Sequence, residues 1–540
     1  MFGKLVARRP RRALALASTL LLGASLTACS PPTSDEGGGG GSDEIILGRS
    51  MDTTTLDLSR NFCDSCQIYN GAVYETLLTA TAADAELEPL LAESWEANED
   101  NTEFTFHLRD DVTFADGSPL EAKDVKWSWE RLKNIKGNAS FMMDGVSGID
   151  TPDEHTVVVH SEYPNSAFFN IASASYMGII NSDVAIENGA TADENAESSD
   201  EAEQWFMANS AGSGQYVLDS YQEGSSLVLT QNENYWGEEP NFSKVTIKDV
   251  ADSSSQLQQL QQGDIDVAMQ LSFDALDQIE ADDNIASEVV PTYNFVYVAL
   301  SPGAPGAPEA LGDPEVRDAI RKAIDYDTVI DAVVAGHADK QSTAIPNGFD
   351  GSADLPLPEY DVAAAKKQLA DAGYADGFDI DVTFPTFTIY GVNFSTMFQS
   401  IQQSLSEVGI TLNLNPIEYS AWSEQLGSAG IPMTSVYYAP DHPDTVQYAQ
   451  YFSRAEGATW GDRAGLPADP KQTDLMADSL AQTGDERLAT LTELGQAMYD
   501  DAIILPIANP QVILANGTNV EGNNYHITHN IDLEQLTFTD

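Results

Sequence analysis

The chain has 540 residues, of which 42% are apolar, and a formal net charge of −60. Its length exceeds the size at which one hydrophobic core usually stops growing, so we expect at least two lobes. A surface this acidic repels nucleic acid and anionic lipid headgroups, which excludes nucleic acid as a partner. We interpret the acidity as adaptation to saline surroundings, where salt screens the self-repulsion.

The first 28 residues have the pattern of an export signal. An apolar run, Ala13 to Leu26, follows five basic residues and no acidic one, namely Lys4, Arg8, Arg9, Arg11 and Arg12. The run is too short to span a bilayer comfortably. The arginine pairs suit both general secretory and twin-arginine export, so the route stays open. Without this segment, 20 basic residues face 85 acidic ones, a net charge of −65.

The residues that end the signal resemble the lipobox of bacterial lipoproteins, and they read Leu26-Thr27-Ala28-Cys29. The resemblance implies that Cys29 receives diacylglycerol and becomes the new N-terminus. Residues 29–42, with five consecutive glycines from Gly37, predict a flexible tether. We therefore expect an exported protein held by lipid at the outer face of the cell membrane, or a periplasmic one.

The two remaining cysteines, Cys63 and Cys66, lie three residues apart in the exported part of the chain. Because that compartment permits disulfides, we expect a local disulfide between them. A zinc site needs a second ligand pair and a redox site needs a thioredoxin-like surround, and the sequence offers neither. His526 and His529 are joined by no further ligand cluster, so we expect no metal and no cofactor.

From residue 43, strand-like and helical segments alternate without a fixed repeat, which predicts a mixed α/β protein. Alternating apolar residues over 103–108 predict a strand, and Asp110-Asp111 predicts a hairpin turn into 112–114. Apolar residues at helical spacing then predict a helix over 121–133. The stretch 193–203 holds six carboxylates and no cation, which predicts a solvated surface insertion.

The second half of the chain carries clear helix boundaries. Leu257 and Leu260 lie in a helix over 253–262 that Gly263 ends. Asp313 and Pro314 predict the start of one helix that continues through Val334. Further helices are expected over 362–372, after Asp361, and over 394–408, where an apolar stripe ends at Gly409.

Several separate blocks, in one order, resemble the extracellular solute-binding proteins of peptide and nickel importers. The resemblance covers residues 44 to 515, and its blocks are Leu91–Trp95, Phe104–Arg109, Phe114–Leu120, Gly212–Tyr216, Asn234–Gly237, Val316–Ile320 and Ala363–Tyr374. It implies the large three-domain class of the type II periplasmic-binding-protein-like α/β fold, with two lobes joined by a two-segment hinge around a ligand cleft.

The expected domain limits follow from that resemblance. Residues 1–28 are the signal peptide and 29–42 the tether. The first lobe has a core domain, made from 43–60, 181–290 and 506–540, and an extra domain over 61–180. The second lobe covers 291–505, so the chain crosses between lobes near 291 and near 505.

The loop from Tyr438 to Asp444 resembles the family loop in which an aspartate holds the amino terminus of a peptide, and Asp441 is the matching residue. An ammonium group withdrawn from water needs a fixed carboxylate as its partner. The match is incomplete, because Tyr438 stands where tryptophan is common and Pro440 removes a backbone donor. In the alternative reading, Asp441 only starts a turn with Pro443.

Other candidate ligand contacts come from both halves of the chain. Ala439 belongs to the same loop, Tyr437, Tyr438, Trp422 and Tyr390 offer rings for stacking, and Phe62, Cys63, Tyr293 and Asn294 lie in segments that resemble the family's pocket walls and hinge. No lysine or arginine occurs between Lys367 and Arg454, where dipeptide-selective relatives place a cation for the peptide carboxylate. A strict dipeptide receptor is therefore disfavoured.

The sequence thus predicts a substrate-binding lipoprotein that captures oligopeptides for the permease and ATPase subunits of an ABC importer. The alternatives are a non-peptide solute, such as an oligosaccharide, a cationic small molecule or a nickel chelate, and a receptor that senses peptides. The chain lacks G-x-S-x-G, H-E-x-x-H and P-loop motifs, so we expect no enzyme. We expect a monomer, because closing lobes need free faces.

Overall fold

A computed structural model describes residues 44–539, apart from 82–85, 353–354, 387 and 429. The expected signal peptide over 1–28, the tether over 29–42 and the lipid-bearing Cys29 lie outside these residues. Within the described ranges, no helix is both long and apolar enough to cross a membrane.

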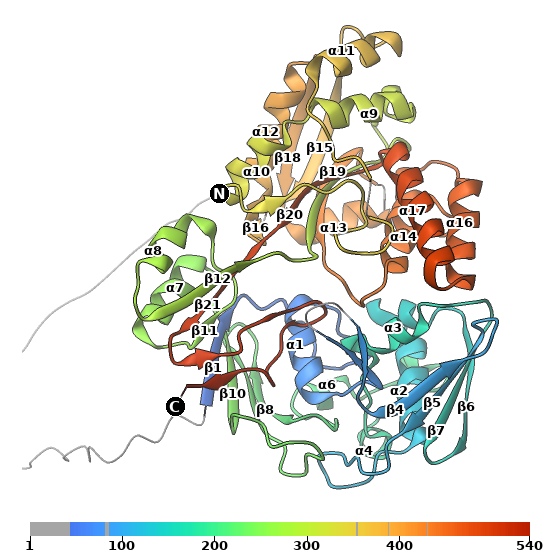
Figure 1. Cartoon of the computed structure of the whole chain (residues 1–540), viewed down its shortest axis with the longest axis vertical. Coiled ribbons are helices and arrows are strands. Elements are labelled where there is room, and N and C mark those ends of the chain that lie inside the picture. Colours follow the sequence, from blue (N-terminus) through green and yellow to red (C-terminus); the bar gives the residue numbers. More distant parts are fainter. Residues whose placement is uncertain (1–43, 82–85, 353–354, 387, 429, 540) are drawn as a thin grey trace, which may run out of the picture. The chain divides into compact units, whose positions relative to one another are not determined.

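The first part of the fold is a seven-stranded sheet built from segments far apart in the sequence (Figure 1). Its order is β12 (Ile285–Val290), β21 (Val512–Gly517), β11 (Val267–Ala268), β1 (Glu44–Arg49), β10 (Lys244–Asp249), β9 (Ser226–Gln231) and β8 (Tyr216–Gln222). The strand β1 pairs in parallel with both β10 and β11. Its side chains Ile45 and Leu47 are fully buried in the core of this sheet.

A four-stranded antiparallel sheet forms the second part, in the order β4 (Ala92–Ala97), β5 (Glu103–Leu108), β7 (Thr156–Ser161) and β6 (Val146–Asp153). The strand expected over 103–108 is confirmed, and its alternating residues Phe104, Phe106 and Leu108 are buried under α2 (Ala122–Ile135). The expected hairpin is wrong, because β5 pairs with β4 and β7 instead. Residues 112–114 contribute only an isolated bridge from Thr113 to Pro119.

The third part is a six-stranded mixed sheet in the order β14 (Ala338–Asp339), β20 (Ile504–Pro510), β13 (Phe295–Leu300), β19 (Met433–Tyr438), β15 (Phe378–Pro385) and β18 (Ile410–Ile417). All six residues of β13 are buried, as expected for an interior strand covered on both faces. The helix α12 (Phe394–Ser406) packs against β18, and α10 (Tyr326–Val334) packs against β20.

The remaining helices and ribbons connect these sheets. The helices are α1 (Asp64–Val73), α3 (Phe168–Ala172), α4 (Ser182–Glu187), α5 (Ala196–Ser199), α6 (Glu203–Phe206), α7 (Ser253–Gln262), α8 (Leu276–Glu280), α9 (Pro314–Ala323), α11 (Val362–Asp371), α13 (Tyr419–Ser428), α14 (Val446–Phe452), α15 (Thr459–Ala464), α16 (Pro470–Ala481) and α17 (Gly484–Asp501). Short antiparallel ribbons pair β2 (Leu78–Ala80) with β3 (Leu87–Pro89), β16 (Thr388–Ile389) with β17 (Val392–Asn393), β22 (Val520–Glu521) with β25 (Thr537–Phe538), and β23 (Tyr525–His526) with β24 (Asn530–Ile531).

One expected helix is in fact two. Asp313 caps α9 as predicted, but the helix ends at Ala323, where Ile324 adopts an extended conformation. Asp325 then caps α10 by accepting a hydrogen bond from the Thr328 N–H at 3.1 Å. The single helix predicted through Val334 is therefore wrong, since a second N-cap interrupts the apolar periodicity.

The chain passes between the seven-stranded and six-stranded sheets at two adjacent places. One lies between β12 and β13, and the other lies between β20 and β21. The Thr292 hydroxyl donates to the Pro510 carbonyl at 2.7 Å, and the Asn509 amide donates to the Thr292 carbonyl at 3.0 Å. The second crossing thus falls at Gln511, and the limit expected at 505/506 cuts through β20.

The boundary expected at residue 61, between the core domain and the extra domain of the first lobe, lies further along the chain. The helix α1 packs against β8, and its residues Ile68, Tyr69 and Val73 belong to the core of the seven-stranded sheet. The core of the four-stranded sheet begins only at Leu77. Residues 61 to about 75 therefore pack with the first sheet, because the apolar face of α1 is complementary to that core.

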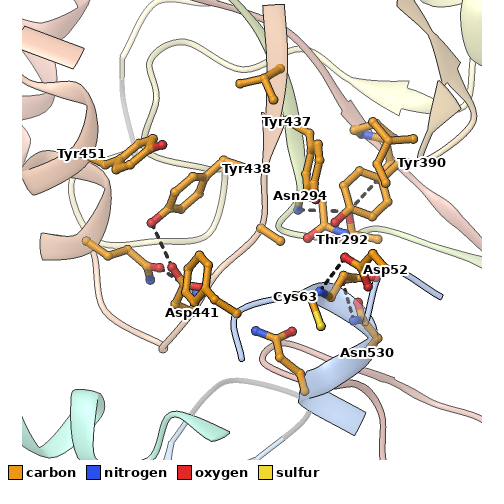
Figure 2. A pocket seen from close by; sticks show the side chains of 18 of the residues that line it. Asp52, Cys63, Thr292, Asn294, Tyr390, Tyr437, Tyr438, Asp441, Tyr451 and Asn530 are labelled. Atoms are coloured by element: carbon orange, nitrogen blue, oxygen red, sulfur yellow. Dashed lines mark hydrogen bonds between the residues drawn. The ribbon is translucent and has the colours of Figure 1, made fainter. Parts of the chain in front are cut away.

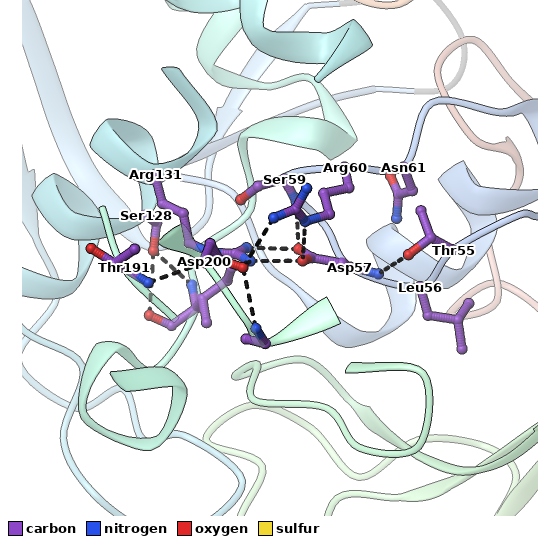
Figure 3. Close-up of polar contacts among 12 residues, drawn as sticks. Thr55, Leu56, Asp57, Ser59, Arg60, Asn61, Ser128, Arg131, Thr191 and Asp200 are labelled. Carbon is purple, nitrogen blue, oxygen red and sulfur yellow. Dashed lines mark hydrogen bonds and ion pairs between the residues drawn. The ribbon is translucent and has the colours of Figure 1, made fainter. Parts of the chain in front are cut away.

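The acidic stretch over 193–203 is not a solvated insertion along its whole length. Asp200 joins a buried ion cluster, in which Arg131 Nε donates to Asp200 Oδ2 at 2.9 Å (Figure 3). Arg131 also makes a bidentate pair with Asp57, at 2.6 and 2.7 Å. A second guanidinium, that of Arg60, lies 3.2 Å from Asp200. The cluster ties the acidic stretch to α2 and to the loop after β1.

Candidate ligand-binding site

A cavity of about 1580 Å³ collects segments from across the fold. Its walls come from the loop after β1 and the start of α1, the two crossings, the hairpin β16–β17, β19 with the loop that follows it, and the C-terminal ribbon β23–β24. Small-molecule sites in proteins typically enclose about 300 to 1,000 Å³, so this cavity has room for a larger ligand.

Most of the expected contact residues meet in this cavity. Nine line it, namely Phe62, Cys63, Asn294, Tyr390, Trp422, Tyr437, Tyr438, Ala439 and Asp441. Figure 2 shows several of them around the same space. Tyr293 does not line it, because its ring packs edge-on against Phe349 with centroids 5.1 Å apart. The crossing contributes its neighbours Thr292 and Asn294 instead.

The carboxylate of Asp441 is buried and lacks a cation. The residue is 7% exposed, and its Oδ2 accepts one hydrogen bond, from the Tyr438 hydroxyl at 3.3 Å (Figure 2). Among the described residues, no Lys, Arg or His nitrogen lies within ion-pair distance of it, and no backbone N–H donates to it. Burial raises the pKa of Asp441 to about 7, against the lowering effect of the Tyr438 hydrogen bond. This geometry does not match the turn-initiating role.

Asp444, three residues later, is also buried but is fully compensated. Its carboxylate pairs with Arg487 at 2.7 Å, and it accepts from the Asn170 amide and the Val446 N–H, each at 2.8 Å. Burial acts to raise the pKa of Asp444, but the Arg487 charge and hydrogen bonds outweigh it and the pKa is lowered. The loop therefore holds one carboxylate with a protein partner and one without.

Tyrosine rings form much of the cavity wall. Eight line it, namely Tyr163, Tyr176, Tyr390, Tyr419, Tyr437, Tyr438, Tyr451 and Tyr525. Tyr437 and Tyr438 are consecutive residues at the end of β19, and their side chains point to opposite sides because side chains alternate along a strand. Each therefore contacts a different group of rings. The Tyr438 and Tyr451 rings are tilted against each other with centroids 5.0 Å apart, and Tyr437 meets Tyr390 edge-on at 5.4 Å. Figure 2 shows these two groups on opposite sides of the β19 end.

Most of the charged residues of the cavity were not predicted from the sequence. Its lining includes six carboxylates, those of Asp52, Asp64, Asp144, Asp252, Asp441 and Glu456, and two arginines, Arg49 and Arg463. Arg49 is 2% exposed and pairs with Asp64 at 2.5 Å. The Arg463 guanidinium lies over the Trp460 ring at 5.0 Å and approaches the Tyr451 hydroxyl at 3.5 Å. No local motif marks these residues, because they come from distant segments.

The start of α1 brings Phe62 and Cys63 to the cavity. A disulfide joins Cys63 to Cys66, and the Tyr176 hydroxyl donates to the Cys63 carbonyl at 3.2 Å. The Phe62 ring lies 5.1 Å from the Tyr176 ring and remains 38% exposed. Asp52 accepts hydrogen bonds from the backbone N–H groups of Asp64 and Ser65, at 3.0 and 2.9 Å, and so holds this helix end in place.

The two histidines near the C-terminus, His526 and His529, contact each other and the protein backbone. The rings of His526 and His529 stack at 3.5 Å, and His526 Nε2 lies 3.0 Å from the Ala80 carbonyl. Burial lowers the pKa of both rings. In the part of the chain that the structure describes, no group of three or more His, Cys, Asp or Glu side chains is arranged to hold a metal.

Two sheets linked by paired crossings, with a cavity lined from both, define a solute receptor of the type II periplasmic-binding-protein fold. The chain belongs to the bacterial extracellular solute-binding proteins, family 5, whose middle-domain model matches residues 86–460. Both the fold class and the family agree with the resemblance seen in the sequence.

The relatives of the chain bind different ligands. It is 27% identical over 496 residues to the probable D,D-dipeptide-binding periplasmic protein DdpA of Escherichia coli, covering 89% of this chain and 91% of that one. A dipeptide-binding protein from Pseudoalteromonas in complex with Met-Leu superposes with a TM-score of 0.79 at 20% identity, covering 92% and 100%. NikA from Brucella suis in complex with Fe(III)-EDTA gives 0.77 at 21% identity, also covering 92% and 100%. These structural likenesses establish the fold alone.

Proposed function

We propose that this protein is the substrate-binding lipoprotein of an ABC importer, and that it captures oligopeptides outside the cell for a membrane permease. The observation that carries the proposal is Asp441, a buried cavity-lining carboxylate without a cation among the described residues. A buried carboxylate of this kind is costly, and a ligand ammonium group would compensate it through a charge-assisted hydrogen bond. The free amino terminus of a peptide supplies that group.

Two features favour peptides longer than a dipeptide. The cavity, at about 1580 Å³, exceeds the usual size of small-molecule sites. Residues 368–453 contain no Lys or Arg that could bind a peptide carboxylate. Two arginines outside that stretch line the cavity, and Arg49 is already paired with Asp64. Arg463 has no carboxylate at ion-pair distance among the described residues. Arg463 contacts the Tyr451 hydroxyl, Tyr451 packs near Tyr438, and Tyr438 contacts Asp441, so a peptide with its amino terminus at Asp441 could place its carboxyl terminus near Arg463. The similarity to DdpA supports a peptide ligand.

The proposed mechanism is capture by closure. The two crossings, joined by Thr292 and Asn509, act as the hinge, and closure of the lobes excludes water from the ligand. The closed face then docks on the permease, and an ATPase subunit drives release into it. Diacylglycerol on Cys29 and the tether over 29–42 keep the receptor at the outer face of the cell membrane, where it acts as a monomer.

A second candidate is a cationic solute other than a peptide, including a metal chelate. The excess of carboxylates and the eight tyrosines of the cavity favour it, because aromatic faces attract cations. The relative in complex with Fe(III)-EDTA shows that the fold accepts a chelate. A receptor that senses peptides without importing them would use the same site.

Native mass spectrometry of the purified protein tests the proposal, since a closed receptor retains its ligand. We expect a set of masses that fragment as peptides, or capture of peptides from a synthetic library after the retained ligand has been removed by unfolding and refolding. A single non-peptide mass, with no peptide captured from the library, would instead support the second candidate.

A further inference from the structure

The hairpin β16–β17 places a tyrosine in an unfavourable backbone conformation at the cavity. Its strands are joined by two residues, Tyr390 and Gly391, with φ of 49° and 78°. A two-residue turn with both φ values positive prefers Asn-Gly, Asp-Gly or Gly-Gly. A bulky residue in the left-handed region is an outlier that persists when the surroundings or the function require it.

The Tyr390 side chain lines the cavity, and its hydroxyl makes no hydrogen bond within the described residues. The hydroxyl oxygen is buried and has no hydrogen-bond partner among the residues that the structure describes. Buried polar groups in native proteins are nearly always hydrogen-bonded, so an unpaired one in a ligand cavity marks a contact that the ligand completes. The ring itself packs edge-on against Tyr437.

Two carboxylates and one guanidinium act on this hydroxyl, so the balance of charge around it is negative. Burial first, and then the carboxylates of Asp64 and Asp52 and the neighbouring tyrosines, hold the pKa of Tyr390 well above its usual value. The Asp64 charge is balanced by Arg49 at 2.5 Å. Asp52 lines the cavity and is exposed, and in the described chain no cation lies within ion-pair distance of it, although its charge also acts on Arg49. Its carboxylate accepts hydrogen bonds from the N–H groups of Asp64 and Ser65. Figure 2 shows Tyr390, Tyr437 and Asp52 together, on the opposite side of the β19 end from Asp441 and Tyr438.

We propose that Tyr390 and Asp52 form a second subsite, which binds a basic side chain of the ligand while Asp441 binds its amino terminus. A lysine ammonium has three donors, which suit the Tyr390 hydroxyl and the Asp52 carboxylate, and its charge suits the faces of Tyr437 and Tyr525. The inference rests on the proposed peptide function and names the class of peptide, one that carries a lysine-like side chain near its N-terminus.

Binding of a positional set of tetrapeptides, measured by titration calorimetry on refolded, ligand-free protein, tests this subsite. The set has lysine at each of the four positions of an alanine peptide, and a matched set has glutamine there. We expect the lysine peptide to bind at least about 10-fold more tightly at one position. Equal binding at every position would overturn the subsite and leave the peptide function standing, whereas no binding by any peptide would overturn both.

Three single variants localise the effect. Tyr390→Phe and Asp52→Asn should each reduce the lysine preference to about 3-fold or less, because each removes one partner of the ammonium. Asp144→Asn removes another cavity-lining carboxylate that is not among the charges acting on Tyr390, and should keep the preference. A preference that survives both of the first two variants, or that Asp144→Asn abolishes equally, would contradict a local subsite.

A turn variant separates this role from folding. Tyr390→Asn installs a residue that the turn prefers, so it should raise the thermal unfolding midpoint and lose the lysine preference together. A lower midpoint would show that packing holds Tyr390 in place, and an unchanged preference would show that the ligand does not use it. Either result would overturn the proposal.

Discussion

The buried carboxylates at two places in this molecule differ in whether a cation of the protein compensates their charge. Asp57 and Asp200 lie between Arg131 and Arg60, and both carboxylates form ion pairs with these guanidinium groups (Figure 3). Asp441 is also buried, yet its carboxylate accepts its single side-chain hydrogen bond from a neutral tyrosine. A buried charge that the protein pairs itself supports the fold, whereas we propose that the unpaired one at the cavity binds a ligand.

The largest expected effect comes from breaking the paired group. Arg131→Met leaves Asp57 and Asp200 buried beside the single cation of Arg60, and should lower the free energy of unfolding by about 3 to 5 kcal/mol. Urea denaturation measures it. The matched control is Arg109→Met, which removes the exposed pair with Asp111 and should cost less than about 1 kcal/mol. Similar losses in the two variants would show that the cluster does not support the fold.

The unpaired carboxylate should make peptide binding depend on pH. Asp441 has a pKa of about 7 in the ligand-free receptor, and the ammonium requires its ionised form. Lowering the pH from 8 to 5 should therefore weaken peptide affinity by about 100-fold, with the loss beginning near pH 7. Titration calorimetry across this range checks it, and Asp441→Asn should abolish most of the dependence. A flat profile in the wild type would contradict the role of Asp441.

The same comparison holds within one loop. Asp444→Asn should lower the free energy of unfolding by about 2 kcal/mol, because hydrogen bonds to a charged group are lost at Arg487. Asp441→Asn should leave stability at neutral pH unchanged or raise it, since it removes an uncompensated charge. For the same reason Asp441 makes the ligand-free protein less stable as the pH rises from about 4 through about 7. Thermal melts at several pH values test both statements.

The smallest effect is expected at Tyr438. Tyr438→Phe removes the hydroxyl that donates to Asp441 but keeps the ring, and should weaken peptide affinity by about 1 kcal/mol. The pH dependence should also shift to higher pH, because the hydrogen bond lowers the pKa of Asp441. An unchanged midpoint of that dependence would show that the hydroxyl does not tune the carboxylate.

Local patterns predicted the elements that local interactions determine. The alternation of Phe104 and Phe106 indicated β5, and Asp252 with Gly263 bounds α7 where the glutamine-rich pattern predicted it. The limit expected at 505/506 is displaced because residues 504–510 continue as β20 of the six-stranded sheet. In the structure, Pro506 sits at a register shift between β13 and β20, where a missing N–H is tolerated.

The site residues that the sequence predicted are those that lie close together in the chain. The loop around Asp441 is contiguous, so one motif indicated Tyr438, Ala439 and Asp441 together. Asp52 and Arg463 come from opposite halves of the chain, and Asp200 meets Arg131 and Arg60 across 69 and 140 residues. No spacing rule reaches across such separations, and the acidic stretch therefore looked solvated.

The most direct test of the account compares a peptide with its N-acetylated form on the wild type and on Asp441→Asn. We expect acetylation to weaken wild-type binding of the best tetrapeptide by at least about 30-fold, because the ammonium partner of the buried carboxylate is lost. On Asp441→Asn the two forms should bind about equally. Equal binding of both forms by the wild type would contradict the assignment of Asp441 to the peptide amino terminus.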